Sequence, residues 1–216
     1  MVSAHSETYA TETVSKPSPV PVKIVIAGGF GVGKTTTVGA ISEIAPLTTE
    51  AAMTSVSLGV DNCGDVTTKT TTTVAMDFGR VTIDESLILY LFGTPGQDRF
   101  GFMWDDLITG SLGAIVLVDS RRLEDCFPAV DYFEHRDIPF VVAVNRFDGT
   151  LHHPIEAIRE ALDLDPGTPV TDTDARDREA VKETVLMLLD AVLAKAMDKA
   201  SHTAASFAPP LPPPTA

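Results

Sequence analysis

Short apolar runs alternate with amphipathic stretches along most of this chain, and the two patterns predict different elements. The apolar runs are dense in Val, Ile, Leu and Ala, which is typical of strands buried on both faces of a parallel sheet. They are residues 22–27, 87–92, 114–119 and 139–144, together with a period-two stretch at 73–81 and a short run near Val170. Each of these segments is predicted to be a strand.

The stretches between the apolar runs have helical periodicity. The predicted helices are residues 35–44, 102–109, 126–135, 154–162 and 177–198. In the last of them, apolar residues recur at three- and four-residue steps and form one core-facing stripe. Residues 46–69 are Thr-rich with weak periodicity, so we expect a mobile loop there, with a short hairpin as the alternative. Alternating strands and helices predict an α/β fold, a doubly wound and mostly parallel sheet with helices on both faces.

The chain length and the composition of its ends predict one domain with two tails. A single domain over residues 22–199 of the 216-residue chain is large enough to bury a proper core. Residues 1–21 are rich in Ser, Thr, Glu and Pro, and residues 200–216 contain the run APPLPPP, so both are predicted to be disordered. A ligand for a proline-binding domain is the alternative for the second tail. No run approaches 18 apolar residues, which argues against membrane insertion.

Net charge and cysteine content narrow the classes of function. The chain has 30 acidic and 16 basic residues, a formal charge of −14, which disfavours a nucleic-acid partner. Its two cysteines, Cys63 and Cys126, have no pairing or metal-ligand pattern and are expected to be ordinary thiols. Such cysteine use favours a cytoplasmic protein.

The first predicted strand leads into a pattern that carries chemistry. Gly28-x-x-x-x-Gly33-Lys34-Thr35 lies between that strand and the first predicted helix, which is the context that a phosphate-binding P-loop requires. Glycines let backbone amides converge on a phosphate, the lysine supplies a positive charge, and the Thr35 hydroxyl is expected to bind Mg²⁺. The predicted phosphate-binding residues of this loop are Gly28, Gly31, Val32, Gly33, Lys34, Thr35 and Thr36.

A second polar cluster, Asn145-Arg146-Phe147-Asp148, follows the strand predicted at 139–144. The Asp148 carboxylate can accept hydrogen bonds from N1–H and the 2-amino group of guanine, whereas adenine has neither donor. Such an acceptor rejects a base that lacks the donors, because it is then left unpaired. The alternative is an aspartate that simply begins a helix. The P-loop earlier in the chain favours base recognition.

Four motifs together resemble those of the Ras-like small GTPases. The Asn145–Asp148 cluster resembles their base-binding N/T-K-x-D motif, with Arg146 in place of lysine, and the planar guanidinium of Arg146 is expected to cover the base face as the lysine does. Residues 73–78 resemble the switch I pattern T-I-G-x-D-F, which implies that Thr73 binds Mg²⁺, although Thr70, Thr71 and Thr72 are rival choices. Residues 92–97 and 174–176 resemble the two remaining motifs, D-T-A-G-Q and S-A-K.

The third motif implies a catalytic residue and contains one departure. Gly96 would give its amide to the γ-phosphate, and Gln97 would orient the attacking water. Gly93 stands where the family has an aspartate, so a carboxylate near Mg²⁺ is expected to be missing, which affects metal affinity or hydrolysis. In the fourth motif, Ala175 would meet guanine O6 beside Arg176.

The departures themselves, together with the phrase DSRRLEDCFPAVDYFE, resemble a bacterial subgroup, the small GTPases of actinobacterial conservon operons, related to MglA-type polarity GTPases. The resemblance covers residues 20–198 and implies a G domain over 22–199. It also implies two partners, a roadblock-type regulatory protein and a sensor-kinase-like membrane protein. Peripheral recruitment to a membrane through such a partner is compatible with a cytoplasmic protein.

The resemblance implies a switch that binds GTP or GDP with Mg²⁺ and hydrolyses GTP slowly. One alternative is a pseudo-GTPase scaffold that holds nucleotide, which Gly93 favours. A less favoured alternative is a P-loop ATPase or kinase, for which no lid-length insertion is present. An arginine that assists hydrolysis could come from Arg80, from Arg99 or from a partner. The pairs Arg121-Arg122 and His152-His153 are interpreted as solvent-facing.

Overall fold

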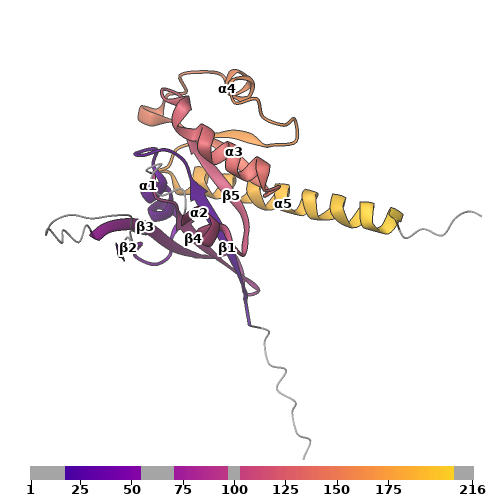
Figure 1. The fold of residues 1–216 in the computed structure, drawn as a ribbon, viewed down its shortest axis with the longest axis horizontal. Coiled ribbons are helices and arrows are strands. Elements are labelled where there is room, and N and C mark those ends of the chain that lie inside the picture. The colour runs from indigo at the N-terminus through magenta and orange to yellow at the C-terminus, as the bar shows by residue number, and fades with distance from the viewer. Residues whose placement is uncertain (1–17, 55–70, 97–102, 207–216) are drawn as a thin grey trace, which may run out of the picture.

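The fold is a seven-stranded sheet with helices on both faces (Figure 1). The computed structural model describes residues 18–54, 71–96 and 103–206. The strands are β1 Val20–Ala27, β2 Leu47–Thr54, β3 Thr71–Thr82, β4 Leu87–Gly93, β5 Ser111–Val118, β6 Phe140–Asn145 and β7 Val170–Thr173. The α-helices are α1 Lys34–Ile41, α2 Trp104–Ile108, α3 Phe127–His135, α4 Ile155–Ala161 and α5 Arg178–Ser206. Two short 3₁₀ helices are η2 Leu123–Cys126 and η3 Phe147–Gly149.

The strand order is β2-β3-β4-β1-β5-β6-β7. Strands β4, β1, β5, β6 and β7 run parallel, whereas β3 is antiparallel to β4 and β2 is antiparallel to β3. The predicted fold class, a mostly parallel doubly wound sheet, is therefore confirmed. Because parallel strands end at the same edge, the loops after β1, β5, β6 and β7 meet there.

Alternation along the central strand explains why both faces of the sheet are covered. Ile24 and Ile26 of β1 point into a core cluster shared with α1 and α5, whereas Val25 and Ala27 point into a second cluster shared with α3 and α4. All four side chains are fully buried. A strand with apolar residues at successive positions is stable only between two layers of helices.

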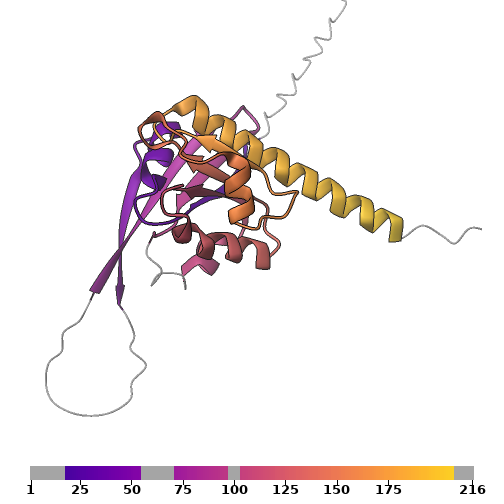
Figure 2. The ribbon, with the colours of Figure 1, turned by 90° about the horizontal axis from the view of Figure 1, so that it is seen from above.

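The structure differs from the sequence prediction at two elements. Within the segment predicted as a loop or hairpin, Leu47–Thr54 forms strand β2 at the edge of the sheet. Helix α5 continues to Ser206, past the predicted end at residue 198, and both it and the β2–β3 hairpin extend away from the body (Figure 2). The added turns of α5 contain Ala200, Ala204 and Ala205, and alanine favours helix without packing.

The predicted tails and the loop before Thr71 fall largely on residues 1–17, 55–70 and 207–216, which lie outside the described residues. Cys63 lies there too. Cys126 is buried, and burial raises the pKa of its thiol to about 12, which suits an ordinary unreactive thiol. Across the described part of the chain, no helix is both long enough and apolar enough to cross a bilayer.

Candidate functional site

The loop between β1 and α1 forms a phosphate-sized cradle. Gly28, Gly31 and Gly33 have φ values of 133°, 73° and 109°, a backbone region that L side chains rarely adopt. A side chain at position 28 would also place its Cβ 2.4 Å from the Leu117 carbonyl oxygen. Gly33 is the N-cap of α1, so the positive end of that helix faces the cradle.

Lys34, the first residue of α1, holds its ammonium group over the cradle. Its Nζ donates to the carbonyl oxygens of Gly28 at 2.8 Å and Gly29 at 2.7 Å. Burial lowers the pKa of Lys34 to about 8, and the nearby negative charge of Asp77 partly opposes this shift. The lysine is thus placed where it would gain most from an added phosphate charge.

This lowered pKa predicts that GDP binding takes up a proton. A bound phosphate favours the charged ammonium and raises the pKa again, so uptake should be close to one proton per nucleotide at about pH 9 and near zero at about pH 7. Calorimetric titration in buffers of different ionisation enthalpy measures the uptake. Lys34→Arg is the matched control, because its guanidinium stays charged and should show none. Equal uptake by the two proteins at about pH 9 would contradict this assignment.

Thr35, the predicted Mg²⁺ ligand, has an unexpected neighbour. Its hydroxyl donates to Oδ2 of Asp77 on β3 at 2.6 Å. Asp77 pairs across the antiparallel ladder with Gly93 on β4, and a Cβ at position 93 would lie 3.0 Å from both Cβ and Oδ2 of Asp77. The expectation that Gly93 leaves the site without a carboxylate is therefore wrong, since Asp77 supplies one from the neighbouring strand.

The Thr35 hydroxyl and the Asp77 carboxylate are the hard oxygen groups that Mg²⁺ prefers. Within the described ranges, no group of three or more His, Cys, Asp or Glu side chains is placed to hold a metal ion. A metal ion beside Thr35 would therefore depend on phosphate oxygens and water for its remaining ligands. The residues present fit Mg²⁺ bound together with a nucleotide.

The loop after β4 lies against the P-loop. A Cβ at Gly96 would lie 2.6 Å from Lys34 Nζ and 2.9 Å from the Cα of Phe30, so only glycine fits without displacing its neighbours. This closeness puts the Gly96 backbone beside the cradle. Gln97, the predicted catalytic residue, lies outside the described residues.

The structure does not bring Thr73 to the cradle. Thr73 lies within β3, where its backbone pairs with Ala52 of β2. It is four residues before Asp77, which corresponds to about 13 Å along an extended strand. Its role as a Mg²⁺ ligand stays a prediction, and it would require this end of β3 to leave the sheet.

Asn145, at the end of β6, joins the three loops of the predicted base site. Its Nδ2 donates to the Val32 carbonyl oxygen at 2.9 Å, and its Oδ1 accepts from the Ala175 amide at 3.1 Å. The side chain is buried, and its Nδ2 would be 2.8 Å from a Cβ at Gly33. The Ala175 amide would have to exchange its bond to Asn145 in order to reach guanine O6.

Asp148 is exposed near this junction, with a left-handed backbone at φ 57°. Arg146, predicted to cover the base, instead lies with its Nε 3.2 Å from Asp172 Oδ2. Arg176 makes two hydrogen bonds to Asp174, at 2.9 and 2.8 Å. Both predicted arginines are therefore paired with carboxylates of the loop and strand beside them.

Arg121 takes a position at the base site that the sequence did not indicate. Its Nε and Nη2 both donate to the buried Asp119 carboxylate at 2.8 Å, which lowers the pKa of Asp119. The guanidinium carbon lies 4.3 Å from the centroid of the Phe147 ring, next to Asp148. Arg121 is exposed, as interpreted from the sequence, and the feature that the sequence analysis did not include is its pairing with Asp119. The sequence feature that could have indicated the pairing of Arg121 with Asp119 is an aspartate directly after a buried strand, followed two residues later by an arginine.

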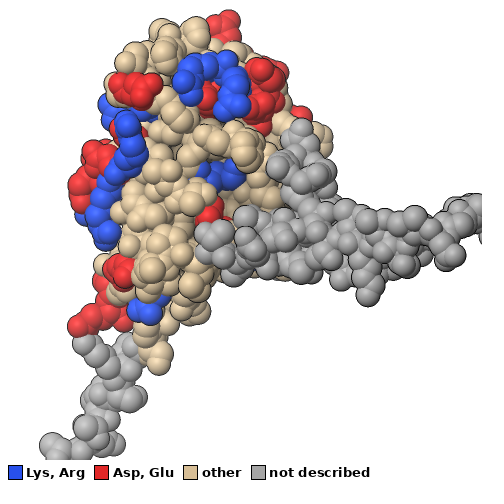
Figure 3. Space-filling model, turned by 90° about the vertical axis from the view of Figure 1, so that its left-hand side faces the viewer, with Lys and Arg blue, Asp and Glu red and all other residues tan. Residues whose placement is uncertain are grey.

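Arg122 is an exposed surface residue, as interpreted from the sequence, and it also contacts the P-loop from outside. Its Nη2 donates to the Phe30 carbonyl oxygen at 3.2 Å, and Asp125 packs so closely that its Cβ would be 2.6 Å from a Cβ at Gly29. Figure 3 shows Lys and Arg grouped beside Asp and Glu on one face of the molecule. The two histidines, His152 and His153, are exposed as expected.

Of the two arginines considered for hydrolysis, Arg99 lies outside the described residues. The backbone amide of Arg80 donates to Ser42 Oγ at 3.2 Å, just past the far end of α1. Because α1 has eight residues, that end is about 12 Å from the P-loop. The described conformation therefore does not favour Arg80 for this role.

Comparisons with known proteins agree with this geometry. Residues 26–195 match the family described as "Conserved hypothetical ATP binding protein". An uncharacterized protein of Methanocaldococcus jannaschii is 31% identical over 129 residues, 59% of this chain and 71% of that protein. The FeoB G-domain from Methanococcus jannaschii has a TM-score of 0.53 at 15% identity, over 80% of this chain and 97% of that one.

A second solved structure, the cytosolic domain of the T. maritima FeoB iron transporter in a GDP form, has a TM-score of 0.58 at 18% identity. The match covers 82% of this chain and 65% of that one, slightly less than two thirds of its length. At such identities, the likeness to both FeoB structures shows a shared fold, that of P-loop nucleotide-binding domains.

Proposed function

This chain belongs to the family described as conserved hypothetical ATP binding proteins, a family of P-loop NTPases, and from that premise we propose that it is a GTP-dependent molecular switch with slow hydrolysis. The observation that carries the proposal is the position of Asn145, which is hydrogen-bonded both to the P-loop at Val32 and to the loop at Ala175. Because Asp148 comes three residues after Asn145, this side chain links the Asp148 turn to the phosphate cradle.

The choice of guanine rests on Asp148. The family description names ATP, but adenine has no donors for a carboxylate at this turn, whereas guanine has two. Arg121 and Arg176 lie within electrostatic reach of Asp148, so the turn that carries this carboxylate has positive charge beside it. An ionised acceptor held beside the base edge supports selection of guanine.

Hydrolysis would depend on positioning more than on covalent chemistry. Lys34 and the P-loop amides would hold the β- and γ-phosphates, Thr35 and Asp77 would hold Mg²⁺, and Gln97 would orient the attacking water. A bound Mg²⁺ ion would offset the negative charge of the phosphate oxygens. Contact of the Gly96 amide with the γ-phosphate would order the loop after β4, and loss of that contact would release it.

The resemblance to the conservon-operon GTPases extends the proposal to partners. A roadblock-type protein would act as regulator, and a sensor-kinase-like membrane protein would recruit the otherwise cytoplasmic switch to the membrane. Such partners would recognise the surface that changes with the nucleotide.

Identifying the nucleotide released from freshly purified, denatured protein tests this proposal. GDP or GTP is expected. ADP or ATP would overturn the choice of guanine and favour the ATPase alternative. GDP without any GTP turnover, even after prolonged incubation with Mg²⁺, would favour the scaffold that holds nucleotide.

Replacement of Gln97 by Leu is expected to slow single-turnover GTP hydrolysis by at least about tenfold, because leucine cannot orient water. GTP affinity should change little, since the side chain does not hold the nucleotide. Glu85→Gln, on the turn before β4, is a suitable control and should hydrolyse GTP at the native rate. Native turnover in Gln97→Leu would mean that another group orients the water.

A further inference from the structure

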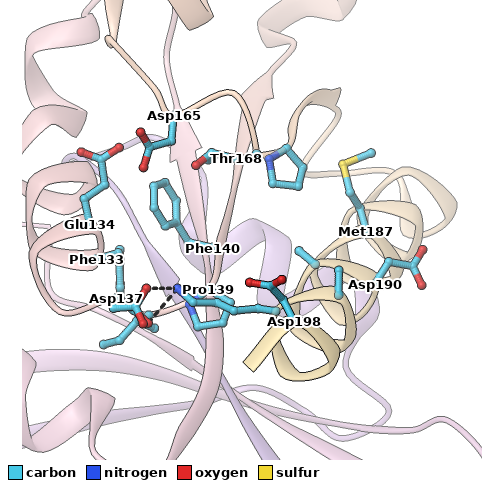
Figure 4. A pocket seen from close by; sticks show the side chains of 16 residues that line it. Phe133, Glu134, Asp137, Pro139, Phe140, Asp165, Thr168, Met187, Asp190 and Asp198 are labelled. Atoms are coloured by element: carbon cyan, nitrogen blue, oxygen red, sulfur yellow. Dashed lines mark hydrogen bonds and ion pairs between the residues drawn. The ribbon is translucent and has the colours of Figure 1, made fainter. Parts of the chain in front are cut away.

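A groove of about 610 Å³ lies at the end of the sheet opposite to the P-loop (Figure 4). Its walls are the end of α3 with the turn that follows, the loop at residues 165–169, and α5. The floor is at the beginning of β6, whereas Asn145 of the nucleotide site is at the end of the same strand. No residue assigned above to the nucleotide site lines this groove.

The floor of the groove is apolar and rigid. Phe133 and Phe140 are buried, with ring centroids 5.9 Å apart. Met187, Ala191 and Ala194 of α5 face them from the other wall. The apolar surface still open to water in the groove is that of Met187 and Ala191, which are half-buried, and of Ala194, which is exposed. Covering this surface with another apolar side chain would be favourable.

Three carboxylates from three different elements surround this floor: Glu134 of α3, Asp165 of the loop and Asp190 of α5. In the part of the chain that the structure describes, none of their side chains is hydrogen-bonded or ion-paired. Asp137, lower in the groove, is already paired, because Lys195 and Lys199 both contact its carboxylate. The unpaired charge is therefore concentrated at the three rim positions.

The rim carboxylates also repel one another. The pKa of Glu134 is raised by burial and by the charge of Asp165, with smaller contributions from Asp131 and Asp163. Such repulsion would be relieved by a ligand that brings positive charge. The groove wall on α5 runs from Met187 to Asp198, about 16 Å along the helix axis, which is longer than a single small cation needs.

We propose that this groove is a docking site for a basic amphipathic segment of a partner protein. An apolar side chain of the segment would pack on Met187, Ala191 and Ala194 of α5, above the buried rings of the floor. Its Lys or Arg side chains would face Glu134, Asp165 and Asp190. The site is separate from the nucleotide and does not depend on the proposed function. Docking is therefore expected to have the same affinity whichever nucleotide is bound.

A labelled synthetic helix of about 12 residues, with Leu on one face and Lys on the other, serves as the probe. Fluorescence anisotropy with the full-length protein at about 0.15 M salt measures its affinity. Binding to the native protein is expected with GDP and with a slowly hydrolysed GTP analogue alike. The same helix with Glu in place of Lys should not bind.

The variant Glu134→Gln/Asp165→Asn/Asp190→Asn is expected to bind the probe about tenfold more weakly, because three exposed ion pairs are lost. Its matched control is Glu156→Gln/Glu160→Gln/Glu183→Gln, which removes the same net charge from exposed positions outside the groove and should bind like the native protein. Ala194→Trp fills the groove on the exposed side of α5 without changing charge, and it should abolish binding.

Four results would overturn the proposal. One is no binding of the Lys–Leu helix by the native protein. Another is equal loss in the groove variant and its matched control, which would indicate general attraction to an acidic surface. The third is undiminished binding by Ala194→Trp, which would indicate that the helix binds outside the groove. The fourth is competition by spermine at the concentration of the helix itself, which would indicate a small-cation site.

Discussion

Asp77→Ala is expected to weaken Mg²⁺-dependent GDP binding by about 10- to 100-fold, the usual loss when a carboxylate that supports a metal ligand is removed. The reason is the 2.6 Å hydrogen bond from Thr35 to Asp77, which orients the hydroxyl and adds negative charge beside it. Binding of a fluorescent GDP analogue, with Mg²⁺ and with EDTA, measures the effect. The loss should be seen only with Mg²⁺ present.

Moving the carboxylate across the strand pair gives a sharper test. Because Asp77 and Gly93 are register partners, the double variant Asp77→Gly/Gly93→Asp restores a carboxylate near Thr35 from β4 and should recover most of the affinity. Gly93→Asp alone places its Cβ 3.0 Å from Cβ and Oδ2 of Asp77 and brings a second carboxylate beside the first, so it should weaken the fold. If Asp77→Ala binds GDP normally, or if the double variant recovers nothing, Asp77 does not serve the metal.

The second large effect concerns the choice of base. The native protein should prefer GDP to ADP by roughly 10⁴, because adenine leaves the Asp148 carboxylate unpaired. Asp148→Asn should lose this preference and favour xanthosine diphosphate, whose 2-oxo group can accept from the new amide. Competition against the same fluorescent GDP analogue measures all three affinities.

Asp172→Asn is the matched control for the base prediction, since this carboxylate is paired with Arg146 in the neighbouring strand. It should keep the preference for GDP. Equal affinity of the native protein for ADP and GDP would contradict the role of Asp148 and agree with the description of the family as ATP binding.

The elements that the sequence predicted well have their determinants close together in the chain. In β1 and the P-loop, the alternating apolar residues, the glycines and Lys34 are contiguous, so their geometry follows from local rules. The position of Asp77 could not be obtained in this way. Asp77 could be recognised as part of the switch I pattern, but its contact with Thr35 follows from the register of β3 against β4.

The pairing of side chains was the other feature that could not be predicted from the sequence. Arg121, Arg122 and Arg146 are each long and flexible, and a motif gives their order along the chain but not their partners. The structure pairs Arg146 with Asp172, although this arginine was expected to cover the base. It pairs Arg121 with Asp119 and places the guanidinium over Phe147. Such pairings depend on how the loops after β5, β6 and β7 come together at one edge of the sheet.

The two hydrogen bonds of Asn145 have a consequence for local unfolding. Val32 and Ala175 bond to different atoms of this one buried amide, so the opening of either loop leaves a buried polar atom of Asn145 without its partner. The two loops should therefore open together as one cooperative unit. Amide hydrogen exchange at Ala175 would then report the opening of a loop more than 140 positions earlier in the chain, and Asn145→Ala would uncouple the two.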